Sequence, residues 1–145
     1  MMKKTLAILA AVLTCLTSCA SKTQLGTFAE LPESAQTFVT TYFNEADIAF
    51  IKVEKEGVHN DYEVKLSSGV EIDFNYKGEL KEIDCNLQPV PEGIVPQVIV
   101  NYVSARFADA FIVKYEIDRR EQKVKLNNSL ELEFDRNGNF LRVDD

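Results

Sequence analysis

The sequence predicts an α+β fold made of two tandem units, each a helix followed by a four-stranded antiparallel meander. The main observation is a repeat, because Glu71-Ile72-Asp73-Phe74 returns as Glu131-Leu132-Glu133-Phe134, and Gly78 returns as Gly138, 60 positions later. In each half, apolar residues first recur at helical spacing and then alternate with polar residues, as they do in strands. A repeat of this length indicates one supersecondary unit built twice.

Further matches set the limits of the two units. They are Lys65-Leu66 with Lys125-Leu126, Ile83-Asp84 with Val143-Asp144, Tyr42 with Tyr102, and Val53 with Val113. We therefore divide the chain into a leader (residues 1–18), a tether (19–29), a first unit (30–86) and a second unit (87–145).

Composition and charge narrow the classes of function. The chain has 145 residues, with 16 Lys and Arg against 23 Asp and Glu, and its hydrophobic fraction of 46% is typical of a globular domain. An acidic chain without a basic stripe repels phosphate backbones. We therefore expect no nucleic-acid partner.

The first 18 residues have the form of a bacterial export signal. Lys3-Lys4 supplies the positive start, and residues 5–16 form an apolar stretch too short to span a bilayer. Leu16-Thr17-Ser18-Cys19 resembles the lipobox of bacterial lipoproteins, which implies cleavage before Cys19 and attachment of lipid to its thiol. The alternative is an ordinary secretory leader with an incidental cysteine. The lipoprotein interpretation predicts a lipid-anchored protein of the bacterial cell envelope that faces the periplasm, with residues 20–29 as a flexible polar tether.

The three cysteines have different expected fates. Cys15 leaves with the leader and Cys19 carries lipid, so Cys85 is the remaining thiol and we expect no intramolecular disulfide. Cys85 follows Ile83-Asp84 at the end of the first unit, where we expect a small, half-buried side chain. No histidine lies near it in sequence to activate the thiol, so a reactive role is not favoured.

A helix opens each unit. Leu31-Pro32-Glu33-Ser34 begins the first, since proline early in a helix costs no hydrogen bond, and Val90-Pro91-Glu92-Gly93 is the expected opening of the second. Pro96 is tolerated only within a first turn, so we expect the second helix to begin near Ile94 or Val95. The apolar stripes of the two helices are Ala35, Phe38, Val39, Tyr42 and Phe43, and Val95, Val98, Ile99, Tyr102, Val103 and Phe107.

Four strands follow each helix. They are expected at residues 50–55, 62–66, 70–76 and 80–85, and at 111–117, 122–126, 130–134 and 140–143. Their alternation gives one dry face and one wet face, which indicates an antiparallel sheet covered on one side. Short loops at residues 67–69 and 127–129, and glycine turns at 75–78 and 135–138, suit hairpins. The two meanders can align as one open, curved sheet with both helices behind it, because the linker at residues 86–89 is short.

These features resemble the PepSY-like family of beta-lactamase-inhibitor-like proteins. The resemblance rests on Leu31-Pro32, Phe38, Tyr42-Phe43, the strand ending in Asp73-Phe74, and Gly78. It covers essentially the whole chain after the leader and implies tandem helix-plus-four-strand units like those of the beta-lactamase inhibitor protein, with no catalytic residues to carry over. The inhibitor's disulfides cannot form here. The wet face also has Glu, Asp, Lys and Asn where the inhibitor uses exposed aromatic residues, so we do not expect beta-lactamase binding.

Patterned charges on the wet face are the candidate partner-binding residues. If Leu66 pairs with Val70, then Lys65 faces Glu71, and Glu63 faces Asp73. In the second unit, by the same reasoning, Lys125 faces Glu131 and Lys123 faces Glu133. Opposite charges across strands contribute roughly 0.2–1 kcal/mol each, so solubility and register explain them adequately. The functional interpretation makes the wet face a docking surface for a cationic peptide or protein. The candidate residues are Lys65, Glu71, Asp73, Lys125, Glu131 and Glu133.

Catalytic and metal chemistry find little support. The Glu63–Asp73 pair would need a sheltered cleft to separate its pKa values, which an open sheet face does not supply. His59 is the only histidine and is expected in a solvated loop, too isolated to build a zinc site. The residues 135–139 lack the third oxygen ligand and the later Glu of a calcium loop, so we expect a turn.

The sequence therefore predicts a non-catalytic, lipid-anchored binding module of the cell envelope that recognises a peptide or protein, with no cofactor and no metal. Inhibition of an envelope enzyme is one form that such recognition could take. The first alternative is a structural envelope lipoprotein without a dedicated ligand, and the second is an enzyme.

Overall fold

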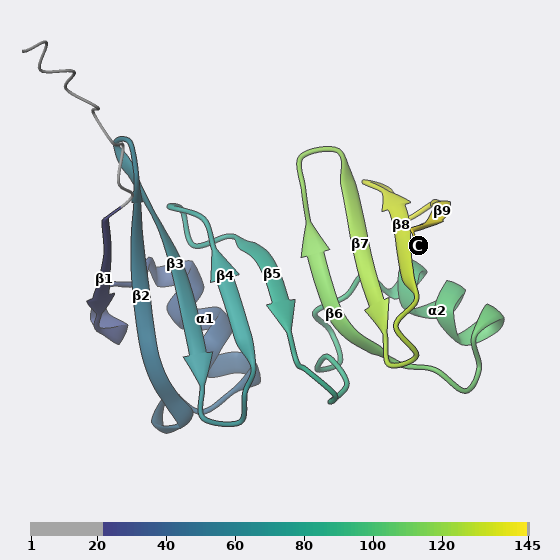
Figure 1. Ribbon diagram of the computed structural model, residues 1–145, viewed down its shortest axis with the longest axis horizontal. Helices are drawn as coiled ribbons and strands as arrows, with labels where there is room; N and C mark the ends of the chain where they lie inside the picture. The colour runs from purple at the N-terminus through teal and green to yellow at the C-terminus, as the bar shows by residue number, and fades with distance from the viewer. Residues whose placement is uncertain (1–21, 145) are drawn as a thin grey trace, which may run out of the picture.

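In the computed structural model, which describes residues 22–144, nine strands form one open antiparallel sheet with two helices on one of its faces (Figure 1). The strands are β1 (Lys22–Gly26), β2 (Ile48–Glu56), β3 (His59–Leu66), β4 (Glu71–Phe74), β5 (Leu80–Asp84), β6 (Ile112–Ile117), β7 (Glu121–Leu126), β8 (Glu131–Asp135) and β9 (Phe140–Asp144). The helices are α1 (Glu33–Tyr42) and α2 (Gln97–Arg106), with short 3-10 turns at Phe28–Glu30 and Glu45–Asp47. Each strand pairs with its neighbours in the chain, so the predicted α+β fold with two meanders in one sheet is confirmed.

β1 lies within the segment predicted to be a tether. Lys22–Gly26 pairs with β2, with Lys22 opposite Lys55 and Gly26 opposite Ile51. The four side chains of β1 that precede Gly26 are all exposed. The sequence of β1 therefore lacks the alternation of buried apolar and exposed polar residues that would predict a strand. Backbone pairing with the long strand β2 supplies the order instead. The tether prediction is therefore wrong for residues 22–26, while residues 19–21 lie outside the described part.

Proline marks the start of both helices. Pro32 is the N-cap of α1 and Pro96 is the N-cap of α2, so α2 begins at Gln97 rather than near Ile94 or Val95. The residue before a proline avoids helical backbone angles, which keeps Val95 out of the helix. Residues 90–93, the predicted opening, belong to the linker instead. Neither helix is long and apolar enough to cross a membrane.

The repeat has two offsets rather than one. Ile48 pairs with Leu66 as Ile112 pairs with Leu126, so β2 matches β6 at an offset of 64, whereas β3 matches β7 at 60. The four extra residues lie in the β2–β3 hairpin, since β2 has nine residues and β6 has six. The predicted matches of Tyr42 with Tyr102 and Val53 with Val113 are therefore wrong. Tyr102 corresponds to Phe38, and Val113 corresponds to Ala49.

Both helices pack on the dry face of the sheet (Figure 1). Val39 of α1 and Val103 of α2 are buried there, and each such side chain stabilises the fold by roughly 1.5–3 kcal/mol. The Phe38 ring meets Phe74 edge-on, with centroids 5.5 Å apart. Tyr102 meets Phe134 in the same way at 5.4 Å, so the two units repeat the same contact. The opposite face carries the charged residues and is the wet face.

In each unit, the first strand of the meander also pairs with a strand that comes earlier in the chain. β5 of the first unit pairs with β6 of the second, with Ile83 opposite Tyr115. β1 pairs with β2 in the equivalent place, because Gly26 lies opposite Ile51 and Ile51 corresponds to Tyr115. β1 thus stands where the last strand of a preceding unit would lie.

Candidate functional site

The predicted register of the wet face is confirmed. Lys65 lies opposite Glu71, and Glu63 lies opposite Asp73. In the second unit Lys125 lies opposite Glu131 and Lys123 opposite Glu133. Salt bridges join Lys65 to Glu71, Lys123 to Glu133 at 2.8 Å, and Lys125 to Glu131 at 3.6 Å.

Glu133 is buried, although the alternation places it on the wet face. Its side chain is 1% exposed because Lys123 and Arg142 cover it from the two neighbouring strands. Both cations form ion pairs with its carboxylate, and Lys123 also reaches Asp144 at 3.1 Å. These carboxylates hold the pKa of Lys123 above its usual range through hydrogen bonds to Glu133 and Asp144. This centre is neutralised from within the chain.

The equivalent centre of the first unit is acidic. Asp73 lies between Glu63 on β3 and Glu82 on β5, at the positions where the second unit has Lys123 and Arg142. Burial, together with the neighbouring Glu82 and Glu63, raises the pKa of Asp73 to about 6. Asp73 makes no salt bridge with any residue of the described part. The carboxyl is half-buried, so it is more sheltered than we expected for an open sheet.

Glu63, Asp73 and Glu82 form a row of carboxylates across three strands. Lysines from the adjoining strands form ion pairs with the two outer members of this row. Lys52 binds Glu63 at 2.9 Å, and Lys114 binds Glu82 at 2.8 Å. Lys81 binds Asp61 at 2.7 Å instead of Asp73. A hollow of about 90 Å³ lies beside the row, with Asp73, Glu63 and Lys81 among its lining residues. Asp73, the middle carboxylate of the row, is therefore the one that a cation from another molecule can reach.

Sequence reasoning missed Glu82 and Arg142, which complete the two rows. The signal was present in the last strand of each unit, where these residues immediately precede Ile83 and Val143. Ile83 is fully buried, so its predecessor has to lie on the wet face. A bulge between Asp73 and Phe74 shifts this register and hides the correspondence in the sequence.

His59 opens strand β3 and does not lie in the predicted loop. Its ring stacks on Tyr76, with centroids 4.0 Å apart and an interplanar angle of 17°. Lys77 lies 5.6 Å from the centroid of the same Tyr76 ring. The three side chains form a small aromatic and basic group at the end of the β2–β3 hairpin.

Cys85 is buried rather than half-buried, with 3% of its surface exposed. Burial raises the pKa of its thiol to about 11, with a smaller contribution from Asp84. A thiol in this state is a poor nucleophile at neutral pH. Cys85 therefore has the properties of a core residue.

The glycine turns are confirmed, and they are built alike. Asn75 Oδ1 accepts hydrogen bonds from the backbone N–H groups of Lys77 and Glu79, at 2.9 and 3.0 Å. Asp135 Oδ1 accepts from Asn137 and Asn139, both at 2.9 Å. These bonds use the side-chain oxygens that a calcium loop would need. Among residues 22–144, no three His, Cys, Asp or Glu side chains are grouped so that they could hold a metal ion.

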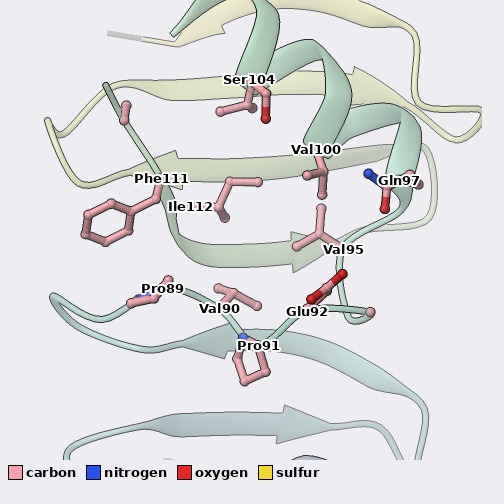
Figure 2. Close-up of a pocket in the computed structure, with 13 residues that line it drawn as sticks. Pro89, Val90, Pro91, Glu92, Val95, Gln97, Val100, Ser104, Phe111 and Ile112 are labelled. Atoms are coloured by element: carbon pink, nitrogen blue, oxygen red, sulfur yellow. The ribbon is translucent and has the colours of Figure 1, made fainter. Parts of the chain in front are cut away.

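A cavity of about 270 Å³ lies between α2 and the linker (Figure 2). Figure 2 shows Val100 and Ser104 of α2 on one side and Val90 and Pro91 of the linker on the other. Glu92 is its single titratable lining residue. Its lining supplies neither a pair of catalytic groups nor a charge pattern like that of the wet face.

Three solved structures are similar to this chain over most of its length. One is described as a putative calcium-regulated periplasmic protein of Bacteroides thetaiotaomicron, with 32% identity and a TM-score of 0.80, covering 85% of this chain and 97% of its own. Two are described as putative periplasmic proteins of Bacteroides vulgatus. The first has 32% identity and a TM-score of 0.81, covering 87% of this chain and 99% of its own. The second has 36% identity and a TM-score of 0.80, covering 86% and 100%.

The sequence comparisons agree with the tandem architecture. No curated protein matches the chain. The family described as "Putative beta-lactamase-inhibitor-like, PepSY-like" matches twice, at residues 18–80 and 60–142. The two matches together span both units of the fold. The chain therefore belongs to the PepSY-like family.

Proposed function

We propose that this protein is a non-catalytic binding module, lipid-anchored through Cys19 in the cell envelope, that recognises a cationic segment of a peptide or protein on its wet face. The observation that carries the proposal is the row Glu63–Asp73–Glu82, in which three carboxylates stand where the second unit has a lysine, a glutamate and an arginine. In the second unit, Lys123 and Arg142 supply the cations that surround the equivalent carboxylate. In the first unit, we propose that a partner supplies them.

The geometry suits a lysine or arginine side chain from a partner. Neighbouring strands lie about 4.8 Å apart, so the three carboxylates span about 10 Å across the sheet. A guanidinium group can donate two parallel hydrogen bonds to one carboxylate and remain close to the next. Burial and the neighbouring Glu82 and Glu63 raise the pKa of Asp73, and the charge of the guanidinium group would offset the repulsion from the two glutamates. Lys65 and Glu71, on the same face, provide a charged margin that would orient the partner.

Several observations favour binding over catalysis. Cys85 is buried, His59 is stacked on Tyr76, and the carboxylates lie on a face with no nucleophile beside them. The similar Bacteroides structures are described as periplasmic, which supports the export signal. Binding of Ca²⁺ to the same carboxylates is the competing outcome, because one of these relatives is described as calcium-regulated.

The test uses a tri-arginine peptide, a tri-glutamate peptide of equal length and CaCl₂ as separate ligands, with binding followed by calorimetry and amide chemical shifts. We expect the tri-arginine peptide to bind, to shift the amides around Asp73, and to weaken as salt rises. Asp73→Asn should reduce that affinity at least fivefold. Glu131→Gln, which removes one charge from the same face of the other unit, should change it less than twofold.

Three results would contradict the proposal. Binding of CaCl₂ alone would assign the row to a metal, and equal losses in the two variants would mean a diffuse charge effect. No binding by any of the three ligands would favour a structural envelope protein. The anchor is tested separately by Cys19→Ser, which should release the protein from the membrane fraction.

A further inference from the structure

The direction of β1 determines which end of the sheet lies closest to an anchor at Cys19. β1 runs away from the β2–β3 hairpin, because Lys22 pairs with Lys55 near the hairpin and Gly26 pairs with Ile51 further down β2. Lys22 lies three positions after Cys19 in the sequence. An extended chain spans at most about 3.6 Å per residue, so the anchor lies within about 11 Å of Lys22.

The hairpin extends beyond Lys22 by a comparable length. Glu56 pairs with His59, so Val58 at the tip lies about two residues beyond the level of Lys55, which is about 7 Å at the rise of a strand. Val58 is 89% exposed, more than any other large hydrophobic side chain of the described part. His59 and the stacked Tyr76 lie directly behind it. An anchor at Cys19 can therefore lie at the level of the tip.

The two ends of the sheet differ in charge. The end that includes the β2–β3 tip also has the β4–β5, β6–β7 and β8–β9 turns, and Figure 1 shows the β2–β3 and β6–β7 hairpins pointing to the same side. These turns contain Lys77, Arg119, Arg120 and Arg136 against Glu79 and Asp118, and the strand ends beside them add Lys22 and Lys55 against Glu56, Glu121 and Asp135. The connections at the opposite end, residues 43–47, 67–70, 85–88, 107–111 and 127–130, contain no lysine or arginine.

Local contacts strengthen this asymmetry. The two acidic residues between the strands at this end are engaged within their own turns, since Glu79 accepts a hydrogen bond from Asn75 and Asp118 accepts one from the Arg119 backbone. Arg136 donates to the Arg119 carbonyl oxygen at 3.1 Å, which brings two of the basic turns together. At this end six basic residues therefore stand against five acidic ones, whereas the connections at the opposite end contain Glu45, Asp47 and Asp109 and no basic residue.

We propose that this end of the sheet, comprising Val58, Tyr76, Lys22, Lys55, Lys77, Arg119, Arg120 and Arg136, rests on the surface of an anionic phospholipid bilayer. The inference rests on the lipid anchor at Cys19 given under the proposed function. Basic residues are attracted to anionic headgroups, and an exposed apolar side chain at a tip can enter the interface. The strands then stand upright on the membrane, and the wet face remains open to the periplasm along its length.

The experiment uses the lipidated full-length protein purified from membranes and reconstituted in vesicles of phosphatidylcholine and phosphatidylglycerol with brominated acyl chains. The chain contains no tryptophan, so one introduced indole reports alone. Val58→Trp places it at the tip, and Leu87→Trp is the matched control, because Leu87 is 80% exposed at the opposite end. We expect a blue-shifted emission and at least threefold more bromine quenching for Val58→Trp than for Leu87→Trp.

A charge variant tests the role of the basic turns. In the Val58→Trp background, Arg119→Gln with Arg120→Gln should reduce the quenching at least twofold, as should replacing phosphatidylglycerol by phosphatidylcholine. Equal quenching of the two indoles, or none, in protein whose N-terminal fragment carries acyl chains would overturn the orientation and leave the anchor standing. An N-terminal fragment without acyl chains would overturn both.

Discussion

Asp73 and Glu133 occupy the same place in the two halves of the sheet, but only Glu133 has a cation on each side. Lys123 and Arg142 bury it completely, whereas Asp73 stands half-buried between Glu63 and Glu82. The same position of the repeat therefore has a neutralised carboxylate in the second unit and a carboxyl group between two glutamates in the first unit. The predictions on charge follow from this difference.

The first prediction is that Asp73→Asn flattens the dependence of stability on pH. The pKa of Asp73 is about 6 in the folded protein against 3.8 ordinarily, so between these values the folded state binds more protons than the unfolded state. The free energy of unfolding of the wild type should therefore fall as pH rises from about 4 to 6 and then level off. Because the group is half-exposed, we expect a contribution of about 1–2 kcal/mol.

Urea unfolding at pH 4 and pH 7 measures this effect. Asp73→Asn should be more stable than the wild type at pH 7 and lack this part of the slope. Glu131→Gln should keep the wild-type slope. Identical slopes for the wild type and Asp73→Asn would show that the carboxyl is not strained in the folded state.

The second prediction concerns the buried carboxylate of the second unit. Lys123→Met removes one of the two cations on Glu133, and we expect it to lower the free energy of unfolding by about 1–3 kcal/mol. Lys125→Met should cost less than about 1 kcal/mol, because both members of the Lys125–Glu131 pair are exposed. Chemical denaturation compares the two. If the double variant Lys123→Met with Glu133→Leu is no more stable than Lys123→Met alone, the cost does not come from the unpaired carboxylate.

The third prediction separates backbone strain from steric contact. Gly57 and Gly78 both have positive φ, at 62° and 79°. A Cβ at Gly57 would meet nothing within 4 Å, whereas one at Gly78 would lie 2.8 Å from Pro32 Cβ and 2.9 Å from Ala35 N. We expect Gly57→Ala to cost about 1 kcal/mol and Gly78→Ala about 2–4 kcal/mol in thermal or urea unfolding. Equal costs would mean that α1 moves freely away from the turn.

The fourth prediction is that Cys85 resists thiol reagents in the folded protein. Burial leaves 3% of the residue exposed and raises its pKa to about 11, so we expect reaction with an aromatic disulfide reagent at least a hundredfold slower than in urea. The measurement uses the mature domain with Cys19→Ser. The same domain carrying Leu87→Cys, exposed two residues further on, should react at once at a single site. Fast reaction of Cys85 itself would show that the end of β5 opens readily.

The fold could be read from the sequence where periodicity and packing act together. The alternation around Ile72 and Leu132 predicted the strands and their register, because a shift by one residue would expose the whole dry face. The start of α2 was predicted too early, because Pro91 and Pro96 both suit the start of a helix. Which of the two prolines the helix follows depends on how the helix packs on the sheet. β1 could not be read at all, since its exposed side chains carry no pattern.

Part of the candidate site could be predicted from the sequence. Cross-strand pairing predicted Lys65 with Glu71 and Lys123 with Glu133, because those contacts lie within one hairpin. The third member of each row, Glu82 or Arg142, comes from the next strand across a bulge, and its alignment depends on tertiary geometry. The burial of Glu133 follows from the same third strand.

The strand pairing also gives the fold a polarity. Each unit accepts a strand at its leading edge and offers one at its trailing edge, so β1 fills the leading edge of the first unit, and within residues 22–144 β9 pairs with β8 alone. Val143 on β9 is 42% exposed, while its counterpart Ile83 is fully covered by the unit that follows it. A third helix-and-meander unit fused after β9 would find its first strand already in place, whereas a unit fused before β1 would find that place taken.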